Sequence, residues 1–306
     1  MNLKNNILIV GGTGFIGYHL AKRSLKKGWT VTSISSKAPK KKRYLPKVKY
    51  LLCDITKKKA LRRNIQKQFK YVVNLGGYVD HSNKKKTYDS HYTGCKNLAN
   101  FFSKKNISSF IQLGSSIEYG NVKSPQNENV KCALAKVKST YGKSKLLATR
   151  YLLRLFKKKK FPVTILRLYL AYGPYQDINR FIPIIIDGCL KNISFNSSKG
   201  IQKRDFIYIS DVINMIFKCL KNKNSKGEIF NVGTGKPKKI KKIIDNIKNN
   251  LKGGNPLYGK IDFRKDEILN LYPSISKAKK KLNWKPKISF ETGLNNTIQY
   301  YKSLRK

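Results

Sequence analysis

Short, largely apolar runs alternate with segments of helical periodicity through the first half of the chain. The apolar runs lie at 7–10, 31–35, 48–53, 71–75, 110–114 and 163–168. The segments with a helical pattern lie at 18–27, 57–68, 92–104 and 141–157. Short apolar runs are typical of strands that are buried on both faces of a parallel sheet. Strands that alternate with helices predict an α/β fold with a doubly wound parallel sheet.

The alternation breaks after Gly173 and Pro174. Beyond this point we expect a helix over 181–189, an extended segment over 203–209, a buried strand over 229–232 and helices over 240–251 and 290–304. The strand over 229–232 would return to the main sheet. The chain is therefore divided into a first domain and a smaller α/β domain. The first domain comprises residues 1–170, with 205–235 returning to it, and the smaller domain comprises 171–204 and 236–306.

Glycines connect the first strand to the first helix. A turn rich in glycine that leads into a helix directs backbone N–H groups at one point, and the helix dipole favours an anion there. This arrangement predicts a Rossmann-type domain that binds the pyrophosphate of a dinucleotide at its first strand–helix turn. The residues expected to form the site are Gly11, Gly14, Phe15, Ile16 and Gly17.

The chain carries 66 Lys and Arg against 15 Asp and Glu, a formal net charge of +51. Such a charge attracts polyanions, so one interpretation is a protein that binds nucleic acid or an anionic membrane. The lysine runs, however, are spread along the whole chain, and aromatic residues do not alternate with them as a base-stacking surface would require. We therefore interpret the runs as solvated surface, including 40–43 and 279–281, and expect no nucleic-acid partner.

The remaining composition indicates a cytoplasmic protein. The five cysteines are scattered without Cys-x-x-Cys spacing, which indicates reduced thiols. The histidines form no ligand cluster, so no metal site is expected. No apolar run approaches the roughly 20 residues that a membrane-spanning helix needs. The first strand begins close to the first residue, which leaves no room for a secretory signal.

Candidate chemistry lies at Tyr141 and Lys145, which open the helix after the fifth strand. Residues four apart share one helix face, so the phenol and the ammonium point into the same space. A nearby cation stabilises phenolate, which allows a tyrosine to exchange a proton with a hydroxyl or a ketone. A lysine-rich chain also produces such pairs by chance. Ser115 strengthens the functional interpretation, because it ends the fifth strand at the edge of the sheet where ligands bind.

Together these motifs resemble the extended short-chain dehydrogenase/reductases that act on nucleotide sugars. The resemblance rests first on Gly11-x-x-Gly14-x-x-Gly17, Ser115-Ser116-x-x-Tyr119-Gly120 and Tyr141-x-x-x-Lys145. It continues with Arg167, Tyr172-Gly173-Pro174, Arg204-Asp205-Phe206, Asp211, Asn231-Val232-Gly233-Thr234-Gly235 and Trp284-x-Pro286. The motifs occur in the family's order over essentially the whole chain.

The resemblance implies a role for each matching residue. Ser115 would hydrogen-bond the reacting oxygen, Tyr141 would be the acid and base, and Lys145 would stabilise its phenolate and contact the cofactor ribose. The adenine would meet Asp54 and Ile55. The other expected contacts are Leu75, Gly76 and Gly77 for the cofactor, and Ser116, Arg204 and Arg264 for the substrate, whose diphosphate the two arginines would bind. Relatives that dimerise through the helices after strands four and five imply a homodimer.

Departures from the family pattern narrow the expectation. Members that prefer NAD end the second strand with an acid, whereas this chain has Ser35-Ser36-Lys37 followed by the cations of 40–43. A hydroxyl and cations suit a 2′-phosphate, so NADP is the first choice of cofactor and NAD the alternative. Ser116 and Ile117 replace the Asp-Glu pair of the 4,6-dehydratases, so water elimination lacks its acid and base. Leu170 replaces an asparagine that is usual near the sugar diphosphate.

The leading hypothesis is therefore hydride transfer at a carbon of a nucleoside-diphosphate hexose. NADPH would reduce a 4-keto-6-deoxy sugar, with Tyr141 giving a proton to the oxygen. The nearest alternative is an NAD-dependent C4 epimerase that uses the same residues and recycles its hydride. A more distant alternative of another class is a nucleic-acid-binding protein built on the same fold, prompted by the charge of +51.

Overall fold

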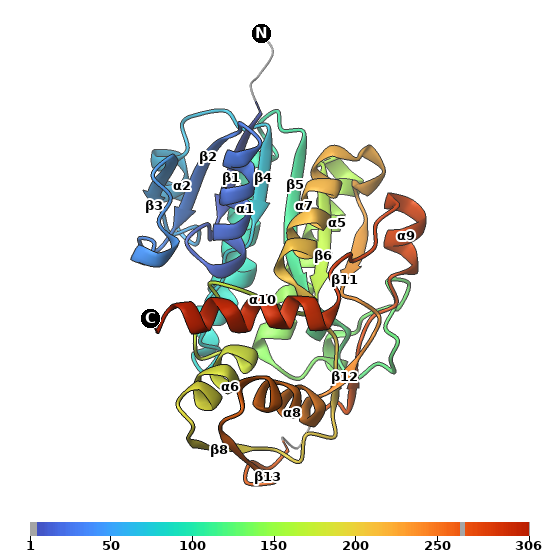
Figure 1. Cartoon of the computed structure of the whole chain (residues 1–306). Helices are drawn as coiled ribbons and strands as arrows, with labels where there is room; N and C mark the ends of the chain where they lie inside the picture. The colour runs from blue at the N-terminus through green and yellow to red at the C-terminus, as the bar shows by residue number, and fades with distance from the viewer. Residues whose placement is uncertain (1–4, 264–266, 306) are drawn as a thin grey trace.

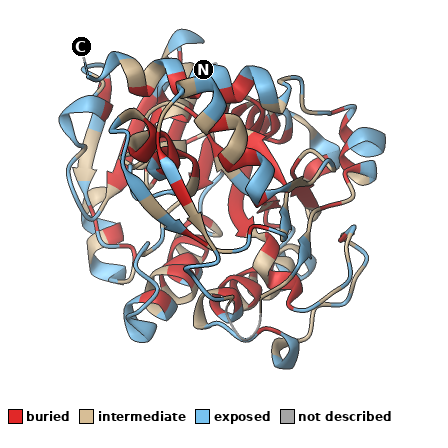
Figure 2. Ribbon diagram, turned by 60° about the horizontal axis from the view of Figure 1, so that its bottom comes forward, coloured by how far each residue is buried: buried red, intermediate tan, exposed pale blue. Residues whose placement is uncertain are grey.

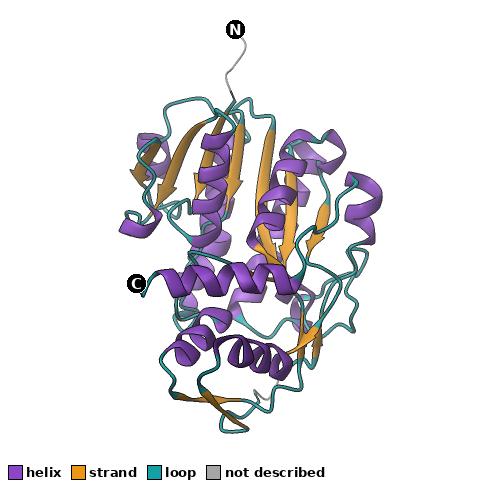
Figure 3. Cartoon of the chain, viewed as in Figure 1, coloured by secondary structure: helices purple, strands orange, loops and turns teal. Residues whose placement is uncertain are grey.

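The computed structural model describes residues 5–263 and 267–305. Its centre is a parallel sheet of seven strands in the order β11-β6-β5-β4-β1-β2-β3 (Figures 1 and 3). The strands are β1 (Asn6–Val10), β2 (Thr30–Ser35), β3 (Val48–Leu52), β4 (Tyr71–Asn74), β5 (Ser109–Ser115), β6 (Val163–Leu168) and β11 (Ile229–Val232). The chain changes direction across the sheet between β1 and β4, the point at which open α/β sheets bind ligands. This topology confirms the predicted α/β class and doubly wound sheet.

Helices cover both faces of the sheet. α1 (Phe15–Lys26) and α7 (Ile209–Lys221) pack on one face, whereas α2 (Lys58–Asn64), α4 (Gly94–Phe102) and α5 (Thr140–Lys159) pack on the other. Along β1, Ile7 and Ile9 belong to the first core and Leu8 and Val10 to the second. None of these four side chains is more than 2% exposed. Both faces of the strand are therefore apolar, and Figure 2 shows the buried strands at the centre of the molecule.

The smaller domain lies beyond the carboxyl ends of the strands, at the bottom of Figure 1. Its core packs side chains of α6 (Phe181–Leu190), α8 (Ile240–Leu251) and α10 (Phe290–Ser303). Small sheets of two or three short strands complete it. They are β7 (Leu170–Tyr172) with β10 (Phe206–Tyr208), β8 (Ser194–Ser197) with β13 (Asn255–Tyr258), and β9 (Lys203–Arg204) with β12 (Lys238–Lys239) and β14 (Asn270–Leu271). The chain returns to the main sheet at β11, which pairs with β6.

Several elements differ from those predicted. The helix predicted from residue 18 begins at Phe15, because the open glycine turn lets it start directly after Gly14. The extended segment predicted over 203–209 is interrupted at Asp205, whose buried carboxylate turns to accept hydrogen bonds from Thr234. Two helices, α7 and α9 (Ser276–Leu282), are not among those predicted from the sequence. In α7, buried apolar residues recur at helical spacing, so its pattern was available in the sequence.

One cation of the run 40–43 is not on the solvated surface, which corrects the prediction for that run. The side chain of Arg43 is 3% exposed, and its Nη2 lies 3.0 Å from Asp177 Oδ1. Both Nε and Nη2 also donate to the carbonyl oxygen of Tyr175, at 3.0 and 2.6 Å. The 3-10 turn Lys41–Arg43 directs this guanidinium inward, where it ties the first domain to the segment that enters the second. Lys40 pairs with the same Asp177 at 3.2 Å.

An imidazole lies at the same junction. A ring nitrogen of His19, on α1, is 2.9 Å from the carbonyl oxygen of Pro174. The ring also meets Tyr175 edge-on, with 5.8 Å between centroids. Burial lowers the pKa of His19 from 6.5 to about 4, with smaller contributions from Lys22 and Arg43. The folded protein therefore keeps this imidazole neutral at pH values where the unfolded chain protonates it.

We predict that this histidine makes the protein less stable as the pH falls. Between about pH 6.5 and 4 the unfolded chain binds a proton that the folded state excludes, so the free energy of unfolding decreases by up to about 1.4 kcal/mol per pH unit for this group. Denaturant unfolding of the wild type and of His19→Asn at several pH values checks this. The variant should have a shallower slope in that window. Parallel slopes for the two proteins would contradict the assignment.

Candidate active site

A cleft of about 1300 Å³ opens at the carboxyl ends of the strands, between the sheet and the smaller domain. It contains every residue that the sequence assigns to the cofactor except Tyr141 and Lys145. The lining includes Gly11, Gly14, Phe15, Ile16, Gly17, Ser35, Ser36, Lys37, Asp54, Ile55, Leu75, Gly76 and Gly77. These residues end or follow β1, β2, β3 and β4, whose carboxyl ends meet at one edge because the strands are parallel.

The glycine turn has the backbone geometry that an anion site needs. Gly11 has φ +78°, which side-chain-bearing residues rarely adopt. A Cβ on Gly17 would lie 2.3 Å from the carbonyl oxygen of Gly11, so only glycine lets α1 pack so closely on the turn. Gly14 precedes α1 without any side-chain cap. The N–H groups of the first helical turn are therefore available to a pyrophosphate, and the turn fits the dinucleotide that the sequence predicts.

The far end of the cleft combines hydroxyls with one nearby cation. The Oγ of Ser35 is buried and has no hydrogen-bond partner among the described residues. Lys37 lines the cleft. Lys40 and Arg43, which the sequence analysis counts among the cations available to a 2′-phosphate, are instead paired with Asp177. That part of the argument for NADP is corrected for Arg43, because Asp177 and the carbonyl oxygen of Tyr175 hold its buried guanidinium in place.

Asp54 keeps part of its carboxylate free at this end of the cleft. Its Oδ1 accepts from the backbone N–H of Thr56 at 2.9 Å and from the hydroxyl of Thr56 at 2.7 Å. These two hydrogen bonds form a local turn directly after β3 and fix the orientation of the carboxylate. The Asp54 side chain is exposed, whereas the neighbouring Ile55 is buried. The pair thus offers a carboxylate edge beside an apolar surface, a combination suited to a nucleoside.

The three predicted catalytic residues come from two elements in contact with each other, β5 and α5. Ser115 ends β5, and Tyr141 and Lys145 lie in the first turns of α5. The Nζ of Lys145 is 5.9 Å from the centroid of the Tyr141 ring and donates to the carbonyl oxygen of Leu113 at 2.7 Å. The lysine is 4% exposed. The buried ammonium of Lys145 and the phenol of Tyr141 therefore lie on the same side of α5.

Two histidines that the sequence analysis leaves unassigned lie against Tyr141. The imidazole of His81 stacks on its ring, with centroids 4.1 Å apart and planes inclined by 14°. His91 meets the same ring edge-on at 4.9 Å. Tyr78, Val79 and Asp80, which precede His81, line the cleft. The loop over residues 78–81 therefore covers one face of the Tyr141 ring. Ser115, Tyr141 and Lys145 themselves are not among the residues that line the cleft.

His91 lies in a π-helical turn, Asp89–Thr93, which is a common device at functional sites. One ring nitrogen is 3.1 Å from the carbonyl oxygen of Tyr78, and Nδ1 is buried without a hydrogen-bond partner among the described residues. Burial, with a smaller effect of the Lys145 cation, lowers the pKa of His91 to about 2. The imidazole is therefore neutral at any pH at which an enzyme works. No spacing in the sequence connects His81 or His91 to Tyr141.

Neither Ser116 nor Arg204, which are predicted to contact the substrate, is among the residues that line the cleft. Ser116 is buried at the start of a 3-10 turn, Ser116–Tyr119. Arg204 pairs with Glu267 and is not among the residues that line the cleft. Arg264 lies outside the described residues. The cleft itself presents Arg180 and Lys86, cations that the sequence analysis does not single out. Leu170 lines it as well, 42% exposed.

Two further observations concern the described part of the chain. Within residues 5–263 and 267–305, no group of three or more His, Cys, Asp or Glu side chains is arranged to hold a metal ion. None of the helices in these residues combines the length and the apolar character that crossing a membrane requires.

The sequence and the fold of this chain are similar to those of known proteins. Residues 7–233 match the NAD dependent epimerase/dehydratase family. A UDP-glucuronate 4-epimerase from Thermodesulfobacterium geofontis is 28% identical over 96% of this chain and 95% of its own. A UDP-N-acetyl-alpha-D-glucosaminuronate decarboxylase from Bacillus cytotoxicus is 27% identical over 99% of both chains. The UDP-glucose 4-epimerase of Thermotoga maritima has the same fold, with a TM-score of 0.89, 24% identity and coverage of 98% and 100%. The resemblance drawn from the motifs is confirmed: the chain belongs to the NAD dependent epimerase/dehydratase family.

Proposed function

We propose that this protein transfers a hydride between a nicotinamide cofactor and a ring carbon of a nucleoside-diphosphate sugar. The observation that carries the proposal is the position of Ser115, Tyr141 and Lys145 at the carboxyl edge of the sheet, beside a cleft that begins at the uncapped glycine turn. The names of the relatives support a nucleotide sugar as the substrate. The long cleft has room for a dinucleotide at one end and a sugar at the other.

Each residue has one task in this chemistry. When bound, the cofactor supplies or accepts the hydride. Tyr141 moves the proton at its phenol oxygen, giving it to the carbonyl oxygen of the sugar in a reduction and taking it from the hydroxyl in an oxidation. Lys145 stabilises the phenolate, and its bond to the carbonyl of Leu113 keeps the ammonium in place. Ser115 holds the reacting oxygen by a hydrogen bond. The neutral ring of His91 packs against the phenol without adding a charge that would compete with Lys145.

We assign the direction of the reaction as the NADPH-dependent reduction of a 4-keto-6-deoxyhexose. β2 ends in Ser35 and is followed by Ser36 and Lys37, so no carboxylate lies there to bind the ribose 2′-hydroxyl of NAD. The exposed Ser36 and Lys37, which both line the cleft, suit a 2′-phosphate. Ser116 and Ile117 provide neither the acid nor the base of an elimination.

An NAD-dependent C4 epimerase is a second candidate with comparable support. The relative named UDP-glucuronate 4-epimerase matches this chain over nearly its whole length. Oxidation and re-reduction of the same carbon require the same three residues, with Tyr141 first taking and then returning the proton. The two candidates differ in how they treat the cofactor, because an epimerase regains its hydride in every turnover and a reductase consumes it.

A homodimer and a cytoplasmic location stay predictions from the sequence. The basic surface supports nucleic acid as the functional partner less well than the site supports a nucleotide sugar. A protein that only binds nucleic acid has no need of a buried lysine beside a tyrosine.

We predict that Tyr141→Phe lowers kcat by about 10² to 10⁴-fold on the true substrate, because the proton donor is lost. Cofactor affinity should stay within about threefold, since the ring and its contacts with His81 and His91 are retained. Steady-state kinetics and fluorescence titration of the reduced cofactor measure the two effects. Turnover equal to that of the wild type would remove Tyr141 from the mechanism.

The cofactor itself gives a second prediction. The protein should be purified in high salt, denatured and analysed for released nucleotide, and the stripped protein titrated with NADPH and NADH. We expect tighter binding of NADPH, and we expect Lys37→Ala to weaken NADPH binding roughly tenfold, the effect of about 1.4 kcal/mol, with little change for NADH. Lys40→Ala is the control, because that lysine pairs with Asp177. Retained NAD that resists dialysis would instead identify the epimerase.

A further inference from the structure

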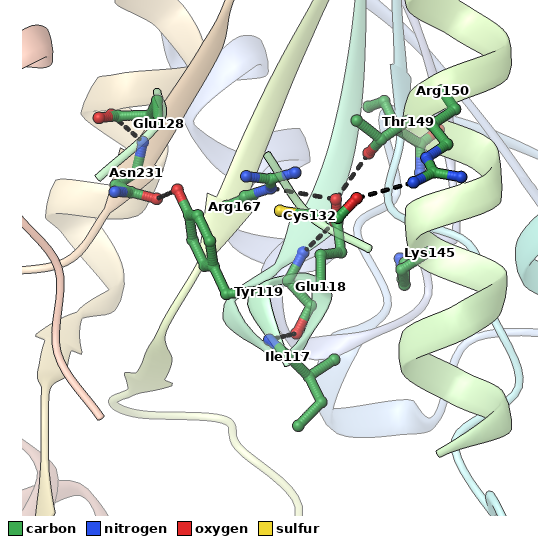
Figure 4. A network of polar contacts seen from close by, with 12 residues as sticks. Ile117, Glu118, Tyr119, Glu128, Cys132, Lys145, Thr149, Arg150, Arg167 and Asn231 are labelled. Atoms are coloured by element: carbon green, nitrogen blue, oxygen red, sulfur yellow. Dashed lines mark hydrogen bonds and ion pairs between the residues drawn. The ribbon is translucent and has the colours of Figure 1, made fainter. Parts of the chain in front are cut away.

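A carboxylate that takes no part in the proposed chemistry lies at the centre of the first domain. Glu118 belongs to the 3-10 turn that follows β5, and its side chain is 0% exposed. Its Oε1 accepts from the backbone N–H of Ser115 at 2.8 Å. Its Oε2 accepts from the hydroxyl of Thr149 at 2.8 Å and from Nε of Arg167 at 3.1 Å. Figure 4 shows this carboxylate between donors from three different elements.

Two of these elements carry the three reacting residues. Ser115 is the last residue of β5, and its own N–H is one of the three donors. Thr149 follows Lys145 by four residues and Tyr141 by eight on α5, so the three side chains share one side of that helix. The carboxylate of Glu118 therefore bonds the end of β5 to the catalytic side of α5, in addition to the direct bond from Lys145 to the carbonyl oxygen of Leu113.

The local sequence makes room for this contact. A Cβ on Gly114 would lie 2.5 Å from Glu118 Oε1, so the residue before Ser115 must be small for the carboxylate to fold back over the strand. Gly114 and Arg167 are directly paired between β5 and β6, which brings the guanidinium under the same carboxylate. Arg167 is held in turn by the ring of Tyr119, 4.3 Å from its Cζ. The strand pairing and the Tyr119 ring thus both help to hold the guanidinium in position beside the carboxylate.

Small displacements of α5 relative to β5 would cost free energy, because the carboxylate of Glu118 is buried. A carboxylate that is removed from water is tolerated only while its oxygens keep their hydrogen-bond donors. A slide of α5 against β5 that separated Thr149 from Glu118 would leave part of a buried charge without a partner. The same slide would move Tyr141 and Lys145 relative to Ser115. Misplacement of reacting groups by about 1 Å can cost about 10²-fold in rate.

We propose that Glu118 is a positioning residue, whose carboxylate sets the separation between Ser115 on β5 and the Tyr141–Lys145 pair on α5. The inference rests on the proposed function for the identity of the reacting residues. It does not depend on which sugar is the substrate or on the direction of the reaction.

The test removes one donor and leaves the buried ion pair intact. Replacing Glu118 itself would leave Arg167 uncompensated and can unfold the protein, so the informative variant is Thr149→Val, which keeps the shape of the side chain and loses the hydroxyl. Thr149→Ser restores the hydroxyl. Thr164→Val is the matched control, because Thr164 is equally buried and its hydroxyl donates to the carbonyl oxygen of Ser225 at 2.8 Å, remote from Ser115.

Two readouts are needed, one of them independent of activity. We expect Thr149→Val to exchange the backbone amide hydrogen of Ser115 at least tenfold faster than the wild type, measured by hydrogen–deuterium exchange of the resting protein. On a substrate that the wild type turns over, kcat should fall roughly tenfold while KM and cofactor affinity stay within about twofold. Thr149→Ser should return both readouts close to the wild-type values. Thr164→Val should lower Tm to a similar extent as Thr149→Val and leave both readouts unchanged.

The outcomes separate the inference from the proposed function. Unchanged exchange at Ser115 in Thr149→Val would overturn the positioning role. So would kcat losses that follow Tm alike in Thr149→Val and Thr164→Val, because that pattern indicates general destabilisation. Faster exchange at Ser115, restored by Thr149→Ser, in a wild-type protein that turns over no nucleotide sugar would uphold the contact between β5 and α5 and reject the proposed function.

Discussion

The buried ion pair of Glu118 and Arg167 is the interaction around which the first domain is arranged. Neither side chain is more than 2% exposed, and removing one partner of such a pair typically costs about 3–5 kcal/mol. Burial alone would lower the pKa of Arg167, but Glu118, together with Tyr119 and Cys132, outweighs it and raises the pKa. The Glu118 carboxylate also accepts from the backbone of Ser115 and the hydroxyl of Thr149, so the pair connects β5, β6 and α5.

Polar contacts extend from this pair towards the smaller domain. The hydroxyl of Tyr119 donates to Asn231 Oδ1 at 2.8 Å (Figure 4). The Nδ2 of Asn231 donates in turn to the carbonyl oxygen of Gln126 at 2.9 Å. Asp205, 1% exposed, accepts from the backbone and the hydroxyl of Thr234 just after β11. Two motifs that mark the family in the sequence, around Asn231 and around Asp205, thus hold the last strand of the sheet against the segment that leads into the second domain.

The charge of +51 has little part in this arrangement. The cations that organise the fold, Arg43, Arg167 and Lys145, are the ones removed from solvent. Most other lysines of the described residues are exposed and lie on helices and loops of both domains. Solvated charges at a distance from one another are screened by salt and change stability little. The fold therefore tolerates an unusually basic surface without depending on it.

The sequence alone determined the parts of the protein that depend on local pattern. Apolar runs, glycine spacing and the spacing of Tyr141 and Lys145 were sufficient for the parallel sheet, the turn before α1 and one face of α5, because each is set by residues close together in the chain. The tertiary structure decided what contacts what across long separations. It buried Arg43 against Asp177, brought His81 and His91 to Tyr141, and placed the carboxylate of Glu118 against Thr149 of α5 and Arg167 of β6. Such contacts follow from the packing of whole elements, and no local spacing encodes them.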